Sequence, residues 1–137
     1  MTPSPAPPPG FELVRTSAFA ELVGPHYVAP AGSTMRFGAW VGPEHTNTFG
    51  GAHGGFIASL VDVAAGRGTR LVLADGRSFR TVLMTTDFTG RAAVGDWLEV
   101  EVVIDRAGGR TVFVSCRVRS GDDLVARASV VLTASSS

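Results

Sequence analysis

A glycine-rich polar loop that runs into a helix constrains this chain more than any other stretch. It spans residues 44–68, EHTNTFGGAHGGFIASLVDVAAGRG. From Gly54 onward, apolar side chains at helical spacing predict a core-facing stripe, made of Phe56, Ile57, Leu60, Val63, Ala64 and Leu71. The opposite strip holds one acid among very small residues, namely Gly54, Ala58, Asp62, Ala65 and Thr69. A solvated helix face would carry long charged side chains, so this strip predicts close contact with another backbone.

The spacing within this strip predicts a second copy of the chain. Asp62 follows Gly54 by eight residues, which is roughly 12 Å along a helix axis. One small reacting group cannot touch both positions. If two copies of the helix packed antiparallel about a two-fold axis near Ala58, Asp62 of each copy would face Gly54 of the other. We therefore expect a homodimer with two equivalent sites.

Length and charge narrow the class of protein. At 137 residues the chain is long enough for one domain and one core. Its 12 basic and 12 acidic side chains balance, and without a basic tract it does not resemble a general nucleic-acid binder. The single cysteine, Cys116, cannot form an internal disulfide and fits a reducing compartment. With neither a signal-like start nor a long apolar run, the sequence predicts a cytoplasmic protein with no membrane partner.

The remaining chain predicts an α+β fold. Five of the eight prolines lie in residues 1–10, so we expect residues 1–13 to form a disordered tail and 14–134 a single domain. Ser17 predicts the cap of a short helix that Gly24-Pro25 ends. Alternating apolar and polar residues predict antiparallel strands at 34–41, 79–89, 97–106, 110–119 and 124–133. A curved antiparallel sheet around one long helix is the simplest arrangement. Because glycine weakens helices, we expect the helix to bend or end near Gly68.

Two motifs carry a resemblance to a known family. The first is HTNxxGxxHGG at residues 45–55, and the second is LxDxAxG at residues 60–66. Together with the predicted sheet, they resemble the hotdog-fold acyl-CoA thioesterases, in the branch of the phenylacetate-pathway (PaaI-like) enzymes. The resemblance covers about residues 17–133. It implies hydrolysis of an acyl-CoA thioester by a dimer or a dimer of dimers, with no cofactor beyond the coenzyme A of the substrate.

The resemblance also implies roles for individual residues. Asp62 would be the catalytic carboxylate, as general base or nucleophile, and Thr81 would orient it. The backbone N–H of Gly54 would bind the thioester oxygen, and Asn47 would help to place the thioester or the water. A helix N-terminus suits this task because it offers unpaired N–H donors and a partial positive charge. A carboxylate among small apolar residues is poorly solvated, which favours its action as a base.

Coenzyme A would need cations for its phosphate groups. Three arginines lie at predicted strand ends or turns, where their side chains could reach a bound nucleotide. They are Arg91, Arg106 and Arg110.

Other interpretations remain open for several of these residues. His53 could brace the loop, or it could act as the base of a hotdog dehydratase or hydratase together with Asp62. Asp62 could be an interface acid, Asn47 a turn cap and Thr81 an ordinary strand residue. In a third hypothesis the chain binds acyl-CoA or a protein without catalysis.

Two further site types find little support in the sequence. His45, which we interpret as a loop anchor, could join His53 and Asp62 around a metal, but no HExxH motif or paired CxxC motif accompanies them. Ser59 could complete a hydrolase triad, yet the chain lacks the G-x-S-x-G turn that exposes such a serine. We therefore predict no metal site. The sequence leaves the acyl group open, although Phe49, Phe56 and Leu83 could shape its pocket.

Overall fold

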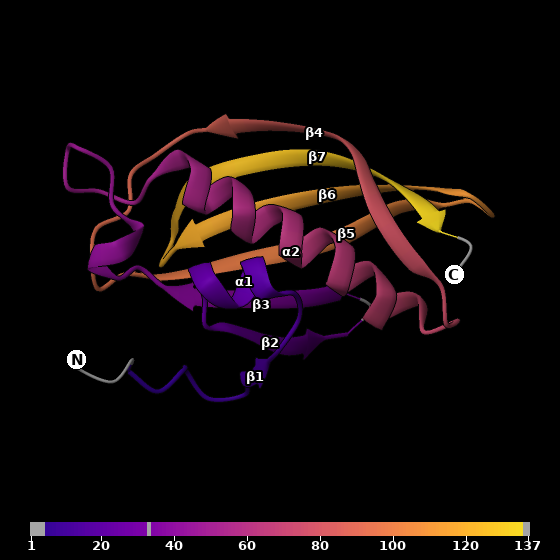
Figure 1. Ribbon diagram of the computed structural model, residues 1–137, viewed down its shortest axis with the longest axis horizontal. Helices are drawn as coiled ribbons and strands as arrows, with labels where there is room; N and C mark the ends of the chain where they lie inside the picture. Colours follow the sequence, from indigo (N-terminus) through magenta and orange to yellow (C-terminus); the bar gives the residue numbers. More distant parts are fainter. Residues whose placement is uncertain (1–4, 33, 136–137) are drawn as a thin grey trace.

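The computed structural model describes residues 5–32 and 34–135, which form one curved sheet around a long helix (Figure 1). In chain order the elements are β1 (Glu12–Val14), α1 (Ala18–Val23), β2 (His26–Ala31), β3 (Thr34–Trp40), a 3₁₀ turn (Pro43–His45), α2 (Gly54–Leu73), β4 (Ser78–Phe88), β5 (Trp97–Ala107), β6 (Thr111–Ser120) and β7 (Asp123–Ser135). The predicted α+β architecture is confirmed, as are the predicted strands and the short helix capped by Ser17.

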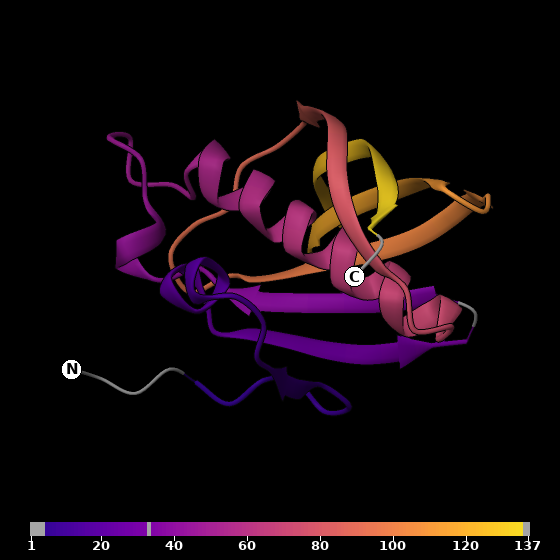
Figure 2. The ribbon, with the colours of Figure 1, turned by 45° about the vertical axis from the view of Figure 1, so that its right-hand side comes forward.

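The sheet places β4 at a free edge. Its strand order is β1-β2-β3-β5-β6-β7-β4, and each neighbouring pair is antiparallel. Figure 2 shows the sheet curving around α2. β4 begins just after α2 ends and runs back along the helix toward the helix N-terminus (Figure 1). Since β4 pairs with β7 on one side, its other side is unpaired within the described residues.

The core lies between α2 and the concave face of the sheet. Alternate residues of the central strands point to the helix because side chains alternate across a strand, and Leu98, Val100 and Val102 of β5 are fully buried there. From α2, the core receives Phe56, Ile57, Leu60, Val61, Ala64 and Ala65. The predicted stripe is therefore mostly confirmed, although Val63 and Leu71 are only half-buried.

Two expectations about α2 are wrong. Ala65 and Thr69 are fully buried inside the chain, so they do not belong to the open strip, which keeps Gly54, Ala58 and Asp62. The helix also neither ends nor breaks at Gly68, because it continues to Leu73. A Cβ at Gly68 would lie 3.2 Å from the side chains of both Phe37 and Val102. The glycine therefore permits close packing of helix and sheet, which offsets its low helix propensity.

The start of the described chain packs against aromatic residues. Phe11 is buried, and its ring centroid lies 5.1 Å from that of Trp97. Trp40 donates a hydrogen bond from Nε1 to the carbonyl of Ala6, at 3.3 Å, and β1 pairs with β2. The packed chain therefore begins before the expected boundary at residue 14, because the aromatic cluster provides apolar surface for a proline-rich segment. Residues 1–4 of the expected tail lie outside the described residues.

Within the described residues, no helix is long and apolar enough to cross a membrane.

Candidate active site

Asp62 and Thr81 meet on the open side of α2. Thr81 of β4 donates a hydrogen bond from Oγ1 to Oδ1 of Asp62 at 2.6 Å, and both residues are exposed. The bond joins residues 19 positions apart and is short, as expected for a hydroxyl donating to a carboxylate. Oδ2 of Asp62 makes no hydrogen bond to any part of the chain that the structure describes. Thr81 therefore orients the carboxylate and leaves one oxygen free for a ligand or water.

The N-terminus of α2 presents a free backbone donor at Gly54. His53 precedes the helix as its N-cap, and its Nδ1 accepts a hydrogen bond from the N–H of Gly55 at 2.8 Å. The N–H of Gly54 has no acceptor among the described residues. A Cβ on Gly54 would lie 3.4 Å from the ring of Phe88. The free donor thus lies next to the end of β4, at the positive end of the helix dipole.

The hydrogen bond of His53 also fixes where the ring carries its proton. A nitrogen that accepts a hydrogen bond is unprotonated, so the neutral ring of His53 carries hydrogen on Nε2. From Nε2 it can donate but not accept. The expectation that His53 could brace the loop fits this bond, which also makes it the N-cap of α2, and this arrangement disfavours its action as a base.

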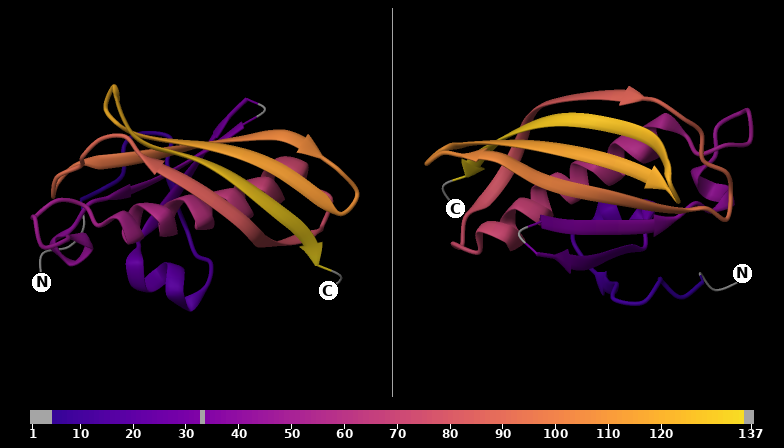
Figure 3. Two further views of the ribbon diagram at one scale, coloured as in Figure 1. Left: turned by 90° about the horizontal axis from the view of Figure 1, so that it is seen from above. Right: turned by 180° about the vertical axis from the view of Figure 1, so that it is seen from behind.

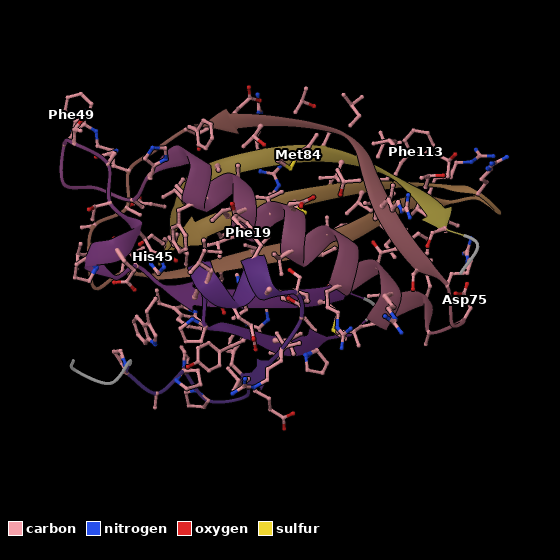
Figure 4. All side chains as sticks on the ribbon, viewed as in Figure 1. Phe19, His45, Phe49, Asp75, Met84 and Phe113 are labelled. Carbon is pink, nitrogen blue, oxygen red and sulfur yellow. The ribbon has the colours of Figure 1, made fainter. Side chains whose placement is uncertain are left out.

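Asn47 shapes the loop before α2. Its Oδ1 accepts hydrogen bonds from the N–H groups of Phe49, at 2.8 Å, and Gly51, at 3.2 Å. The backbone of Asn47 also bonds Gly51 through its N–H at 2.8 Å. The side-chain Nδ2 has no hydrogen-bond partner within the described residues. Phe49, at the loop tip, is 94% exposed and points away from the body of the molecule (Figure 4).

His45 anchors the same loop from below. It is buried, and its ring stacks on Phe56 with 3.8 Å between centroids. Its Nδ1 accepts the N–H of Gly42, and its carbonyl accepts the N–H of His53. Figure 4 shows His45 inside the fold below the loop. The described residues contain no group of three His, Cys, Asp or Glu side chains that could hold a metal ion.

Ser59 is likewise held by its own helix. It donates its hydroxyl to the carbonyl of Gly55, at 2.7 Å.

Asp62 and Gly54 open onto two different hollows of one chain. The hollow at Asp62, here the Asp62 hollow, lies between α2, β4 and the start of α1, and is lined by Thr16, Ser17, Asp62, Val63, Gly66, Arg67, Arg70, Ser78, Phe79, Arg80 and Thr81. The hollow at Gly54, here the Gly54 hollow, contains Asn47, Phe49, Ile57, Phe88 and Arg91. A single chain therefore brings Asp62 to Thr81 and Asn47 to Gly54, but keeps the two pairs apart.

The three arginines expected near coenzyme A are also separated within the chain. Arg91 lines the Gly54 hollow. Arg106 and Arg110 lie at the end of β5 and in the turn before β6. Figures 1 and 3 show this turn at the opposite end of the sheet from the loop before α2. Only Arg91 is therefore near the candidate donor of its own chain.

Several residues near the candidate groups carried no recognisable signal in the sequence. Phe88 lies beside Gly54 because β4 returns along α2, a path that strand alternation does not reveal. Arg70 and Arg80 come together at the Asp62 hollow for the same reason. Helical spacing places Arg67 and Arg70 on neighbouring turns of α2. The position of β4 along the helix, which the sequence does not reveal, brings Arg80 to the same hollow.

Comparison with known proteins places this geometry in context. The family model described as Thioesterase superfamily matches residues 49–133. The chain is 38% identical over 126 residues to the Pseudomonas aeruginosa protein PA0474, which is named as an esterase, covering 90% of this chain and 94% of that protein. It is 33% identical over 82 residues to acyl-coenzyme A thioesterase THEM4 of Xenopus laevis, covering 60% of this chain and 36% of that protein.

Solved structures share the arrangement of helix and sheet. The conserved protein PA5202 of Pseudomonas aeruginosa has a TM-score of 0.80 and 26% identity, covering 88% of this chain and 95% of that one. The Escherichia coli PaaI protein of the phenylacetic acid degradation operon has a TM-score of 0.77 and 19% identity, covering 87% and 85%. The smu.793 protein of Streptococcus mutans, solved with acetyl CoA, has a TM-score of 0.70 and 22% identity, covering 79% and 86%.

Proposed function

The chain belongs to the Thioesterase superfamily and is a thioester hydrolase of the hotdog fold, and from this premise we propose that it hydrolyses acyl-CoA at sites shared by two copies. The family match and the likeness to the PaaI protein confirm the resemblance inferred from the two motifs. One observation carries the finer proposal. Asp62 and Gly54 line different hollows of one chain, so each candidate group lacks its counterpart until a second chain is added.

The free edge of β4 supplies a way to add that chain. β4 is 11 residues long, and its large exposed apolar side chains Val82, Leu83 and Phe88 are 61%, 57% and 53% exposed. A long apolar edge strand is a template for pairing with another strand. Burying this edge in a homodimer would also remove the risk of aggregation that it presents.

The register of that pairing follows from two contacts in the chain. Thr81 touches Asp62, and Phe88 lies beside Gly54. If two β4 strands paired antiparallel about a two-fold axis midway between positions 81 and 88, Thr81 of one copy would face Phe88 of the other. Asp62 would then approach the partner's Gly54. An antiparallel pairing of the two α2 helices about Ala58, midway between positions 54 and 62, would bring the same groups together.

The proposed chemistry assigns one task to each group. The thioester oxygen accepts a hydrogen bond from the Gly54 N–H of one copy, where the helix N-terminus stabilises the developing negative charge. Asp62 of the other copy takes a proton from water as the water oxygen attacks the carbonyl carbon. The tetrahedral intermediate collapses, the carbon–sulfur bond breaks, and the sulfur of coenzyme A leaves as it takes up the proton held by Asp62, which regenerates the carboxylate. Thr81 holds the carboxylate, and Asn47 offers Nδ2 to the thioester or the water.

Direct attack by Asp62 is the other route that the same geometry supports. It would form an acyl-aspartyl anhydride that water then hydrolyses. Both routes need the same four residues and no cofactor apart from the coenzyme A of the substrate. Arg91 in the Gly54 hollow is the nearest candidate for a phosphate contact, with Arg106 and Arg110 available from other chains of an oligomer.

The capping bond of His53 supports the hydrolase over the dehydratase. A dehydratase would need His53 as a base, and its Nδ1 is already occupied by the N–H of Gly55. Turnover of enoyl-CoA or hydroxyacyl-CoA that disappears in His53→Ala but survives in Asp62→Ala would reverse this preference. A module that only binds acyl-CoA would be stabilised by the ligand and would release no thiol.

Complementation between two inactive variants tests the shared site. Asp62→Ala removes the carboxylate, and Gly54→Pro removes the backbone donor while keeping a residue that is tolerated at the first helical position. Each variant alone should release almost no thiol from acyl-CoA. Unfolding and refolding an equal mixture should restore up to about a quarter of wild-type activity, because half of the dimers then hold one intact site.

The control for complementation is a mixture of Asp62→Ala with Asp62→Asn, which contains no intact site and should stay inactive. Near-full activity of Asp62→Ala alone would overturn the catalytic role of Asp62. No recovery in a mixture shown to contain heterodimers would overturn the shared site.

A further inference from the structure

The Asp62 hollow carries an excess of positive charge. Arg67, Arg70 and Arg80 line it, and Asp62 is the one acid among its lining residues. Two of the arginines come from α2, beyond Asp62 toward the helix C-terminus, and the third comes from the neighbouring strand β4. Three like charges around one hollow repel one another, so their convergence favours an anion between them.

The three guanidinium groups also lack acidic partners. Arg15, Arg36, Arg77 and Arg127 each form a salt bridge elsewhere in the chain. Within residues 5–32 and 34–135, Arg67, Arg70 and Arg80 form none, and Nε of Arg67 is buried without a hydrogen-bond partner. A buried unpaired donor on a charged group is costly. A ligand that accepts hydrogen bonds in this hollow would remove that cost.

We propose that the Asp62 hollow binds a carboxylate at the far end of the acyl group, so that the preferred substrates are acyl-CoA thioesters with an acidic acyl chain. This inference rests on the proposed function, which puts the thioester at Asp62. The planar fork of an arginine matches a carboxylate in shape as well as charge. Because the hollow also contains Asp62, the bound carboxylate and the reacting carbonyl would belong to the same acyl group.

The position of the arginines along α2 favours the acyl arm over coenzyme A. Arg67 follows Asp62 by five residues and Arg70 by eight, which is roughly 7 Å and 12 Å of helix axis. Helical side chains also lean back toward the N-terminus, which shortens the distance to Asp62. A short diacid chain spans this range. The phosphates of coenzyme A are separated from its sulfur by the whole pantetheine arm.

The test compares two substrates of similar length, adipoyl-CoA and heptanoyl-CoA, which differ in the terminal carboxylate. Thiol release gives kcat/KM for the wild type, for Arg70→Gln and for Arg80→Gln, both exposed positions whose change leaves the core untouched. The wild type should prefer adipoyl-CoA. In each variant, kcat/KM for adipoyl-CoA should fall about tenfold. kcat/KM for heptanoyl-CoA should stay nearly unchanged. Arg119→Gln, exposed on β6 outside the hollow, is the matched control and should keep the full preference.

A binding measurement complements the kinetics. Adipate, the free acid product, should raise the melting temperature of the wild type and of Arg119→Gln, and should raise it much less in Arg70→Gln. Equal kcat/KM for both substrates in the wild type would overturn the inference while leaving thioester hydrolysis intact.

The same assays separate the remaining outcomes. If Arg70→Gln instead lost discrimination between coenzyme A thioesters and their 3′-dephospho forms, the hollow would bind the nucleotide, and the assignment to the acyl group would be wrong. Absence of thiol release from every substrate would be a failure of the proposed function itself.

Discussion

The Gly54 hollow and the Asp62 hollow are built in different ways. In the first, the turn before the donor depends on short-range contacts, since Asn47 bonds residues two and four positions later and His53 bonds a residue two positions later. Its other wall includes Phe88 of β4 and Arg91. The second depends on a contact between α2 and β4, across 19 positions of the sequence. These local hydrogen bonds shape the backbone just before and at the donor. The orientation of the carboxylate requires β4 in place beside α2, and in the proposed site each group is completed by a second chain.

The largest expected effect falls on the backbone donor. Gly54→Pro removes the N–H at a position where the preceding His53 has φ −66° and ψ 136°, a conformation that proline accepts after it. We expect kcat for acyl-CoA to fall by about 10² to 10³-fold, the loss typical of one oxyanion donor. Steady-state kinetics with a circular dichroism check of folding measures it.

Gly54→Ala is the matched control, because it adds a Cβ at ordinary contact distance from Phe88 and keeps the N–H. Equal losses in the alanine and proline variants would show that space at Gly54 matters and the donor does not.

Loss of the Thr81 hydroxyl should have a smaller effect on the Asp62 hollow. Thr81→Val keeps the shape of the side chain but removes the hydrogen bond to Asp62. We expect kcat to fall by roughly tenfold, as for a single bond to a charged group, with little change in KM. Thr81→Ser restores the hydroxyl and should recover most of the activity; a serine variant as slow as the valine variant would contradict an orienting role.

Removal of the N-cap should affect stability more than chemistry. His53→Ala leaves the N–H of Gly55 without its acceptor, so we expect the free energy of unfolding to fall by about 1 kcal/mol. Chemical denaturation measures it. His53→Asn supplies another capping oxygen and should regain most of the loss. A large drop in kcat in the asparagine variant, with stability restored, would instead indicate a chemical role for His53.

The smallest expected effect concerns the pH dependence of stability. His26 is buried under α1 and donates Nε2–H to the carbonyl of Ala20 at 2.8 Å. Burial lowers its pKa from the ordinary value of 6.5 and outweighs the hydrogen bond to Ala20, which raises the pKa, while the nearby His45 lowers it slightly further. The folded chain therefore binds this proton less readily than the unfolded chain, so stability is lost as pH falls below about 6.5.

His26→Gln keeps a donor but does not titrate. Between about pH 7 and pH 5, a range that includes the ordinary histidine pKa, the free energy of unfolding of this variant should change less than that of the wild type. The same slope in both proteins would assign the acid sensitivity to other groups.

Residue patterns predicted the parts of the molecule that depend on local order. The strand alternation, the Ser17 cap and the start of α2 at Gly54 follow from periodicity and capping chemistry. The family resemblance also indicated the candidate groups Asp62, Gly54, Asn47 and Thr81, and the structure joins Asp62 to Thr81. Helix periodicity did not predict that the packing of α2 on the sheet requires a glycine at position 68, because this depends on Phe37 and Val102 of other strands.

The error about the small residues of α2 has a clear physical cause. Small residues on a helix look alike whether they face a partner chain or the chain's own sheet, so Ala65 and Thr69 were assigned to the wrong surface. The arginines of the Asp62 hollow could not be recognised for a related reason. Arg80 of β4 lies near Arg67 and Arg70 of α2 because of the position of β4 along the helix. No periodicity within either element encodes that position.

The aromatic cluster around Trp97 gives this protein a built-in optical reporter. Both tryptophans of the chain are in it, with ring centroids 4.9 Å apart, and Phe11 and Tyr27 complete it. Intrinsic emission will therefore follow the docking of the first strand and the corner of the sheet beneath it. Because neither tryptophan lines the Asp62 hollow, ligand titrations that rely on quenching would need a fluorophore placed among its lining residues.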